Sequence, residues 1–398
     1  MESTPVPSPL SVSPGSLAAA FAQVPDPRRA ARVIYPLPAI LALAVAALLA
    51  NHRSVLAIAE WGARQDAPML AALGFAEGRT PCQSTLHRLF CQLDGDVLAA
   101  RLTACFAPSA APSPDAAPQG VAIDGKAQRG RLRFTADGGP IVHALSAFCH
   151  EQGIVLAHEP IATGPDKAEA ELTVAPALLA RIDWRERVLT GDALFCQTAV
   201  CEQVMAAGGD YAVLVKENQG TLYRDIALLF DPSPTVPAAP LTDRRVASTL
   251  ETGHGRTMER RELVASTDLT EYLDWPGAAQ VFRLERTWRE HGKAKRTLHY
   301  GITSLHPAEA DAARLLALRR GHWSIENGLH RHKDVNFGED ASLIHVGAGP
   351  TVMALLRDAA LSLLHQAGIR RIASSLRRHS QQPERAVALV LSPLPTGA

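Results

Sequence analysis

The sequence has no excess of charge of either sign, and this absence limits how the protein could bind a charged partner. Its 40 lysines and arginines are balanced by 40 aspartates and glutamates. A protein that attracts nucleic acid through a global positive field is therefore excluded. Any binding of a polyanion must depend on local basic clusters.

Cysteine and histidine motifs typical of zinc sites are also missing. No C-x-x-C pair and no H-E-x-x-H motif occurs, which argues against structural and catalytic zinc. His330 and His332 would point to different faces of a helix and form a poor chelate. The six cysteines are expected to be buried, reduced thiols of a cytosolic protein; they are Cys82, Cys91, Cys105, Cys149, Cys196 and Cys201.

No apolar run is long enough to cross a membrane. The most apolar stretch, residues 37–50, is shorter than the roughly 20 residues that a membrane helix needs. Pro36 and Pro38 at its start fit a buried helix with proline in its first turn. Residues 1–16 are rich in proline and serine and predict a disordered arm, not a signal peptide. We therefore expect a cytoplasmic protein with no membrane partner.

The N-terminal third predicts a helical domain at residues 17–107. A chain of 398 residues is too long for one ordinary core, so several domains are expected. Helices are expected at residues 39–50, 55–64, 84–93 and 96–106. Ser84 or Thr85 is the expected N-cap of the third helix. With His87 and Arg88 on that helix, the domain is either a DNA reader of the helix-turn-helix type or a bundle that only packs on the next domain.

After a linker at residues 108–120, the pattern changes to strands. Three strand-like runs are followed by a helix, a strand, a second helix and a further strand, which together fill residues 121–240. The order β-β-β-α-β-α-β is the ribonuclease H-like order. It predicts an α/β fold with a mixed sheet and helices on both faces.

The remaining chain divides by pattern into three segments. Residues 241–305 contain long, alternating and basic runs, which predict a strand-rich insertion. Residues 306–370 are expected to complete the α/β domain, with a long helix at about residues 307–332. Residues 371–398 form a basic C-terminal tail.

Two aspartates end apolar, strand-like runs. Asp124 in VAIDGKA and Asp192 in VLTGDA each precede a small residue. An acid at the carboxyl end of a central strand lies where open α/β sheets bind ligands. Considered singly, each aspartate is explained equally well by a turn or a cap, and Asp192 could cap the next helix.

A third acid, Glu326, lies in GHWSIENGLHRHKDVNFGED. On a regular helix the following residues share one face, because they are three or four positions apart: Arg319, His322, Glu326, His330 and Lys333. That face borders the apolar one instead of opposing it, which favours a polar site over a solvated surface. An ion-paired helix flank is the alternative.

Two aspartates and a glutamate, brought together from strand ends and a helix, could hold two divalent metal ions. Carboxylate oxygens suit Mg²⁺, which takes most of its other ligands from water and substrate phosphate. Two such ions about 4 Å apart promote in-line displacement at phosphorus, with one at the attacking and one at the leaving oxygen. No serine, tyrosine or cysteine nucleophile is then required.

Five motifs occur in an order that resembles a known family. They are VAIDGKAQRG, VLTGDALFCQ, YAVLVKENQGTLYRDI, GHGRTMERREL and GHWSIENGLHRHKDVNFGED. They resemble the signatures of DDE-type insertion-sequence transposases of the ISAs family. Upstream, PCQSTLHRLF and the segment from residue 21 resemble that family's associated N-terminal domain. The resemblance extends to about residue 370 and implies a ribonuclease H-like fold with a strand-rich insertion.

The same resemblance implies the site and its chemistry. Asp124, Asp192 and Glu326 correspond, in that order, to the three catalytic, metal-binding acids. Two Mg²⁺ ions are implied, with Mn²⁺ as a substitute. The implied activity is metal-dependent cutting of double-stranded DNA at element ends, followed by strand transfer into target DNA. Because two DNA ends must be held together, we expect a homodimer on DNA, associated with the nucleoid.

Two other classes of function remain as alternatives. One is a catalytically silent, transposase-derived DNA-binding protein, and the other is a ribonuclease H-like nuclease without strand transfer. Arg331 stands where the family often has tryptophan. Lys333 lies at the lysine position of the family, seven residues after Glu326. Asp334, Glu339 and Asp340 match the family segment but receive no role from the sequence beyond packing or capping.

Local basic clusters are the candidates for DNA contact, at residues 126–133, 254–261, 283–296 and 370–380. The first three are favoured because they lie between the acids in the sequence, although each could be a solvated face. Trp288 could stack on a base or sugar, and phosphate contacts would make binding salt-sensitive. The predicted DNA-contact residues are Lys126, Arg129, Arg131, Lys216, Arg256, Arg260, Arg286, Trp288, His322, His330 and Lys333.

Overall fold

The chain forms two compact units, neither of which is continuous in sequence. Unit 1 comprises Met1–Ser113, Gly125–Val174 and Glu326–Ala398, and unit 2 comprises Pro114–Asp124 and Ala175–Ile325. The structure is a computed structural model that describes residues 13–107, 117–128, 130, 142–161, 167–232, 241–253, 256–290 and 293–395.

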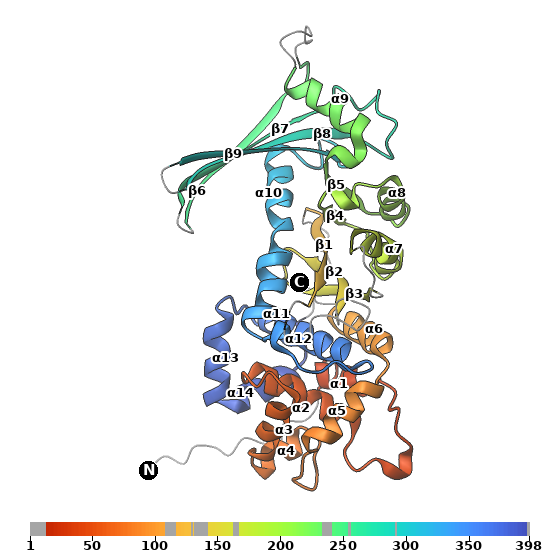
Figure 1. Ribbon diagram of the computed structural model, residues 1–398, viewed down its shortest axis with the longest axis vertical. Coiled ribbons are helices and arrows are strands. Elements are labelled where there is room, and N and C mark those ends of the chain that lie inside the picture. Colours follow the sequence, from red (N-terminus) through yellow and green to blue (C-terminus); the bar gives the residue numbers. More distant parts are fainter. Residues whose placement is uncertain are drawn as a thin grey trace. The chain divides into compact units, whose positions relative to one another are not determined.

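Unit 2 is built on a mixed sheet with the strand order β1-β4-β5-β9-β8-β7-β6 (Figure 1). β1, β4 and β5 are parallel, whereas β5 and β6 to β9 pair in antiparallel fashion. The last three residues of β1 belong to unit 1. The strands are β1 (Gln119–Ala127), β4 (Arg187–Gly191), β5 (Asp210–Val215), β6 (Arg245–Gly253), β7 (Arg256–Ser266), β8 (Gln280–Glu290) and β9 (Lys293–Thr303).

Helices cover both faces of this sheet. α10 (Ala312–His322) packs its leucines on one face, against Leu263 and Phe282 among others. α8 (Thr198–Ala206) and α9 (Gly220–Phe230) lie on the other face (Figure 1). Neighbouring residues of a strand point to opposite faces, so β8 contacts helices on both faces of the sheet. The predicted mixed α/β architecture is confirmed.

Unit 1 is mostly helical and adds a β-hairpin. The hairpin joins β2 (His143–Cys149) to β3 (Val155–Pro160), with an irregularity at residues 147 and 148. α7 (Lys167–Ala180) crosses from unit 1 to unit 2. The other helices are α1 (Leu17–Phe21), α2 (Leu37–Leu49), α3 (Val55–Ala63), α4 (Ala67–Ala72), α5 (Gln83–Gln92), α6 (Gly95–Phe106), α11 (Arg331–Val335), α12 (Gly349–Gln366), α13 (Ile372–Gln381) and α14 (Pro383–Leu391).

The interior of unit 1 is organised by α2 and α12. α2 is apolar on all sides, as expected of a helix buried all round, and it packs against α1, α3, α12 and α14. Pro38 lies in its first turn, as predicted. Across the described residues, no helix combines the length and apolarity that a membrane span requires.

The helices between residues 17 and 107 differ in detail from the prediction. α5 begins at Gln83, and its N-cap is Cys82 instead of Ser84 or Thr85. The short helices α1 and α4 were not predicted, because each offers less than two turns of pattern. That residues 17–107 form a separate domain and bind DNA stays a prediction.

The predicted helix at residues 307–332 is shorter and interrupted. α10 starts only at Ala312, where Asp311 accepts a capping hydrogen bond from the Arg314 amide at 2.8 Å. It ends at His322 and is followed by a π-helical turn, Ile325–His330, and by α11. A helical face calculated for regular α geometry therefore does not apply beyond residue 325.

Candidate active site

Asp124 and Asp192 follow equivalent positions on two adjacent parallel strands of unit 2. Ala122 of β1 is paired with Thr190 of β4, and each aspartate lies two residues further along the chain. β1 continues to Ala127, whereas β4 ends at Gly191, so Asp124 lies within its strand and Asp192 lies directly after its strand. The sequence predicted both acids at strand ends, which does not hold for Asp124, and it could not show that the strands are neighbours.

Asp192 combines a structural contact with its position at the sheet edge. Its carboxylate accepts a hydrogen bond from the Leu194 amide at 2.9 Å and caps the short turn Ala193–Phe195. The residue is exposed, whereas Asp124 is half-buried. The capping role that the sequence allowed for Asp192 is therefore present, and the cap holds the carboxylate at the end of β4.

A buried guanidinium contacts the backbone of β4 and β5. Arg319 of α10 is 3% exposed, and its Nη1 donates to the carbonyl oxygens of Gly191 at 3.0 Å and Ala212 at 3.1 Å. Burial lowers the pKa of Arg319 to about 10, against the opposing effect of Asp192. Arg319 therefore stays cationic at neutral pH and sets a positive charge near that carboxylate.

His322, one α-helical turn later, is neutral at physiological pH. Its Nδ1 lies 3.4 Å from Thr190 Oγ1 on β4. Burial lowers the pKa of His322 to about 3; the charge of Arg319 lowers it further, and Asp124 raises it. The predicted phosphate contact of His322 is therefore limited to a neutral imidazole, which provides a hydrogen bond but no charge.

Glu326, the third predicted acid, is the first residue of the last segment of unit 1. It lies in the first turn of the π-helix and is exposed. Single π-helical turns within α-helices occur often at functional sites. The preceding residue, Ile325, is fully buried and anchors the start of this turn.

The chemistry of the acids fits a hard divalent cation. Two carboxylates on neighbouring segments of the sheet offer only oxygen ligands, the type that Mg²⁺ prefers. Within the ranges that the structure describes, no group of three or more His, Cys, Asp and Glu side chains is arranged to hold a metal ion. The oxygen donors of Asp124 and Asp192 fit Mg²⁺ by their chemistry, and the complete set of metal ligands is a proposal.

A cluster of buried and half-buried charges occupies unit 1 and contains residues that the sequence left without a role. Its members, here called the interior charge cluster, are Lys126, His158, Lys333, Asp334, Glu339, Asp340, Arg357 and Asp358. Residues separated by about 200 positions are joined in it. Such pairing has no local sequence signal, so sequence reasoning could not find it.

Lys126 is held by acids of the last motif. Its Nζ lies 2.7 Å from Asp334 Oδ1, 3.6 Å from Glu339 Oε2 and 3.9 Å from Asp340 Oδ1. Nearby, the side-chain Nε2 of Gln128 donates to the backbone carbonyl oxygen of Glu339 at 3.0 Å. The structure thus gives Lys126 an internal partner for its charge, in place of the predicted DNA phosphate.

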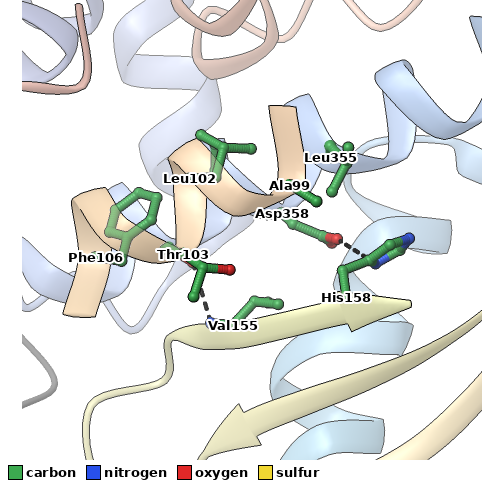
Figure 2. Close-up of a pocket in the computed structure, with 10 residues that line it drawn as sticks. Ala99, Leu102, Thr103, Phe106, Val155, His158, Leu355 and Asp358 are labelled. Atoms are coloured by element: carbon green, nitrogen blue, oxygen red, sulfur yellow. Dashed lines mark hydrogen bonds and ion pairs between the residues drawn. The ribbon is translucent and has the colours of Figure 1, made fainter. Parts of the chain in front are cut away.

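Lys333 is also internal. It is 3% exposed, and its Nζ lies 2.8 Å from Asp358 Oδ1 and 3.4 Å from Glu339 Oε1. Asp358 of α12 also pairs with His158 of β3 at 3.3 Å, beside an apolar pocket between α6, β3 and α12 (Figure 2). The predicted phosphate contact of Lys333 is corrected to a buried ion pair, because its charge has no path to solvent in this arrangement.

The cluster is charged in the folded protein. Burial alone would lower the pKa of Lys333, but Asp358 and Glu339 outweigh it and raise that pKa. Burial would raise the pKa of Glu339 and Asp358, yet Lys333 and other cations bring both below their usual values. The charges of Lys333, Glu339 and Asp358 are therefore favoured by their partners in spite of burial.

The glycine after Asp124 has a specific packing role in unit 1. A Cβ atom at Gly125 would lie 2.1 Å from Oε1 of Glu171. Glu171 is buried on α7, and the same oxygen lies 3.4 Å from Nε2 of His143 on β2. The absence of a side chain at Gly125 therefore lets a buried carboxylate approach the backbone directly after Asp124.

Comparison with known proteins follows the same division of the sequence. Residues 116–363 match the family described as "Transposase DDE domain", which covers more than half of the chain. The chain belongs to this transposase family. Residues 18–106 match the family described as "DDE_Tnp_1-associated".

Relatives of this DDE transposase family member are similar over most of their length. A Xanthobacter autotrophicus protein, named only by its position in the dhlA 3′ region, is 31% identical over 73% of this chain and 94% of its own. YncI of Escherichia coli O157:H7, named provisionally as a transposase, is 28% identical over 86% and 85%. The H repeat-associated YhhI of Escherichia coli K12, likewise provisionally named, is 27% identical over 87% and 91%.

Among solved structures, the chain matches a piggyBac transposase in a synaptic complex with hairpin DNA. The TM-score is 0.38 and the identity 10%, over 96% of this chain and 83% of that chain. The family assignment rests on the sequence comparisons.

The DNA-contact residues predicted on the long strands are largely paired with acids. Arg260 donates to Glu262 at 2.6 Å. Arg286 makes two hydrogen bonds with Glu259, at 2.6 and 3.0 Å, and stacks over Trp288 at 4.7 Å. The charge of these arginines is thus partly neutralised within the sheet of this family member.

The other predicted contacts divide into two groups. Lys216 is exposed and directly follows β5, which pairs with β4, the strand that ends before Asp192. His330 is half-buried in the π-helical turn. Arg129, Arg131 and the side chain of Arg256 lie outside the described residues.

Proposed function

We propose that the chain is a DNA transposase of the ISAs group, which cuts double-stranded DNA at the ends of its own element and joins the cut strand to target DNA. Membership of the transposase DDE domain family supports this proposal. The observation that carries it is the parallel pairing of β1, which contains Asp124, with β4, which ends directly before Asp192. Two carboxylates in this arrangement suit phosphoryl transfer with a bound divalent metal.

In the proposed site, Asp124, Asp192 and Glu326 hold two Mg²⁺ ions, with Mn²⁺ as a substitute. When bound, such ions supply Lewis acidity and activate the attacking oxygen in hydrolysis and transesterification at phosphorus. Glu326 enters this set from its place in the motif and from the family resemblance. The ribonuclease H-like assignment has the same support, together with the observed order of strands and helices.

The chain's own residues position Asp192. Arg319 donates to the carbonyl oxygens of Gly191, the last residue of β4, and of Ala212, within β5, and it sets a positive charge near Asp192. The amide of Leu194 fixes one oxygen of Asp192. Because Arg319 cross-links β4 to β5 and the Leu194 amide holds its carboxylate, Asp192 is positioned before any substrate binds.

DNA binding in this proposal uses charges that the protein does not already neutralise. Lys216, at the strand-end edge of unit 2, is one such contact, and it has no ion-pair partner among the described residues. Arg129, Arg131, Arg256 and His330 are further proposed contacts from the sequence. We also propose that two copies act together on the two DNA ends, in association with the nucleoid.

The experiment is a cleavage and joining assay on DNA that carries the terminal repeats of the element. Purified protein with Mg²⁺ should nick the repeats and transfer the strand to a second DNA. Asp124→Asn, Asp192→Asn and Glu326→Gln should each abolish the cut. Asp183→Asn is the matched control, since Asp183 is an exposed aspartate of unit 2 paired only with Arg185 on the surface.

Three outcomes separate the proposal from its alternatives. Full activity of Asp124→Asn would contradict the assigned site. Tight binding of the repeats without cleavage would indicate a silent, transposase-derived binding protein. Cleavage without strand transfer would indicate a nuclease.

A further inference from the structure

The basic clusters of the chain differ in how far the protein neutralises them. On the long strands of unit 2, Arg260 is paired with Glu262, and Arg296 is paired with Glu285 at 2.7 Å. Lys126 is paired with Asp334. Guanidinium and ammonium groups that already have carboxylate partners gain less from a DNA phosphate, since the existing pair must be broken.

The cluster at residues 370–385 is of the opposite kind. Its five arginines, here called the α13 arginines, are Arg370, Arg371, Arg377, Arg378 and Arg385. All five are exposed, and none has an ion-pair partner among the described residues. The segment contains one acid, Glu384. In a chain with no net charge, this is a local excess of positive charge.

α13, the helix that carries Arg377 and Arg378, is fixed on unit 1 by its other side. Ile372, Leu376 and His379 are buried and occupy one face of α13, which packs against α2 and α14. Figure 1 shows α13 at the outside of the helical group of unit 1. The anchored face leaves Arg377 and Arg378 on the solvent side of the helix, since they are one and two residues from the buried Leu376.

The arginines are spread over consecutive segments of the chain. Arg370 and Arg371 directly precede α13, Arg377 and Arg378 lie on it, and Arg385 lies on α14. Burial lowers the pKa of His379, and the charges of Arg385 and Arg378 lower it further. These two arginines of consecutive helices therefore add to the same positive potential.

The surface between the arginines has short polar side chains. Ser374, Ser380 and Gln381 on α13 are exposed. Serine and glutamine hydroxyl and amide groups, together with arginine, are common donors to DNA phosphate oxygens. Arginine in particular forms bidentate hydrogen bonds with phosphate.

We propose that the α13 arginines form a surface of unit 1 that binds the phosphate backbone of double-stranded DNA. The surface lies outside the three clusters that sequence position favoured, and its five arginines have no ion-pair partner among the described residues. The proposal rests on the proposed function as a transposase but concerns binding, which is measured without cleavage. Backbone contacts of this kind position DNA and carry no sequence preference of their own.

The test measures the affinity of the full-length chain for a labelled 30-bp duplex of arbitrary sequence, in EDTA so that no cutting occurs. Arg377→Gln/Arg378→Gln is compared with Arg64→Gln/Arg185→Gln, two exposed arginines that have acidic partners. We expect the first variant to bind roughly tenfold more weakly and to lower the slope of log K against log salt by about 1.8, or 0.9 for each lost phosphate contact. The control should match the wild type.

A second measurement keeps the proposal testable if the glutamine variant does not fold. Phenylglyoxal modifies exposed arginines, so the wild-type chain is treated with and without the duplex, and the α13 arginines are followed by mass spectrometry. We expect DNA to protect Arg377 and Arg378. Equal modification with and without DNA would overturn the proposal.

The remaining outcomes are also decisive. Protection that follows protein concentration in the absence of DNA would overturn the proposal and make the surface a contact between copies of the chain. Wild-type affinity and salt slope in a folded Arg377→Gln/Arg378→Gln variant would overturn it while leaving cleavage, and hence the proposed function, intact. A wild-type chain that binds no DNA would contradict both the proposed function and the DNA-binding surface formed by the α13 arginines.

Discussion

Cys82 shows how a single residue departs from the general expectation for its type. The sequence predicts six buried thiols, yet Cys82 is exposed at the N-cap of α5, and only Cys149, Cys196 and Cys201 are buried. Hydrogen bonds from Ser84 and Thr85 lower the pKa of the Cys82 thiol to about 6. The partial positive charge at the N-terminus of a helix also stabilises a thiolate.

We predict that iodoacetamide modifies Cys82 first at pH 7. Its thiolate is the main form above pH 6, whereas burial raises the pKa of Cys105 to about 11. The rate of Cys82 modification should fall as the pH drops through 6, and Ser84→Ala should raise the pH at which the rate is half-maximal. Peptide mapping checks the order, and first modification of Cys91 or Cys105 would contradict it.

Gly125 provides a second test at the residue scale. Gly125→Ala places a methyl group 2.1 Å from the Glu171 carboxylate, so we predict a loss of about 1–3 kcal/mol in the free energy of unfolding. Gly220→Ala is the matched control, because nothing lies within 4 Å of its added Cβ. Urea unfolding measures both variants. Equal stability of the two would show that Glu171 does not approach Gly125 as described.

At the scale of elements, the interior charge cluster connects the end of β1, β3, α11 and α12 within unit 1. We predict that Lys333→Met costs about 3–5 kcal/mol, because it leaves Asp358 and Glu339 without their nearest cation. The double variant Lys333→Met/Asp358→Leu should lose less than the sum of the single changes. Arg64→Ala, which breaks an exposed pair with Glu60, should change stability by less than about 1 kcal/mol.

The same cluster predicts how stability depends on pH. The pKa values of Glu339 and Asp358 are lowered on folding, so their contribution is present above the unfolded values near pH 4 and is lost as the pH falls below them. The pKa of Lys333 is raised, so its contribution is present below roughly pH 10. Urea unfolding at pH values from about 5 down to about 2 should therefore show a steep loss of stability in the wild type. A wild type with the same slope as the double variant would contradict this.

The π-helical turn marks the limit of helix reasoning from sequence. The apolar spacing of Leu315, Leu318, Ile325 and Leu329 predicts one continuous helix, and each of these side chains is indeed buried. The pattern does not show that the backbone changes from α to π geometry at Ile325. Hydrophobic periodicity reports which side chains are inside, but not a one-residue change in hydrogen-bond spacing.

At the scale of the whole molecule, local patterns predicted the order of elements, while contacts between distant residues determined their roles. The order β1, β2, β3, α7, β4, α8, β5 agrees with the predicted order, because strand and helix periods are local signals. The partners of Lys126 and Lys333 could not be predicted, since charged pairs more than about 20 residues apart leave no periodic trace. For the same reason, the sequence could not show that the α13 arginines lack ion-pair partners among the described residues.

We propose above all that Asp124, within β1, and Asp192, directly after β4, together bind catalytic metal. The most direct test replaces each carboxylate with a thiolate and measures cleavage of terminal-repeat DNA with Mg²⁺ and then with Mn²⁺. Asp124→Cys and Asp192→Cys should lose cleavage with Mg²⁺, which binds sulfur poorly, and should regain part of it with the more thiophilic Mn²⁺. Full cleavage with Mg²⁺ by either variant would contradict the claim.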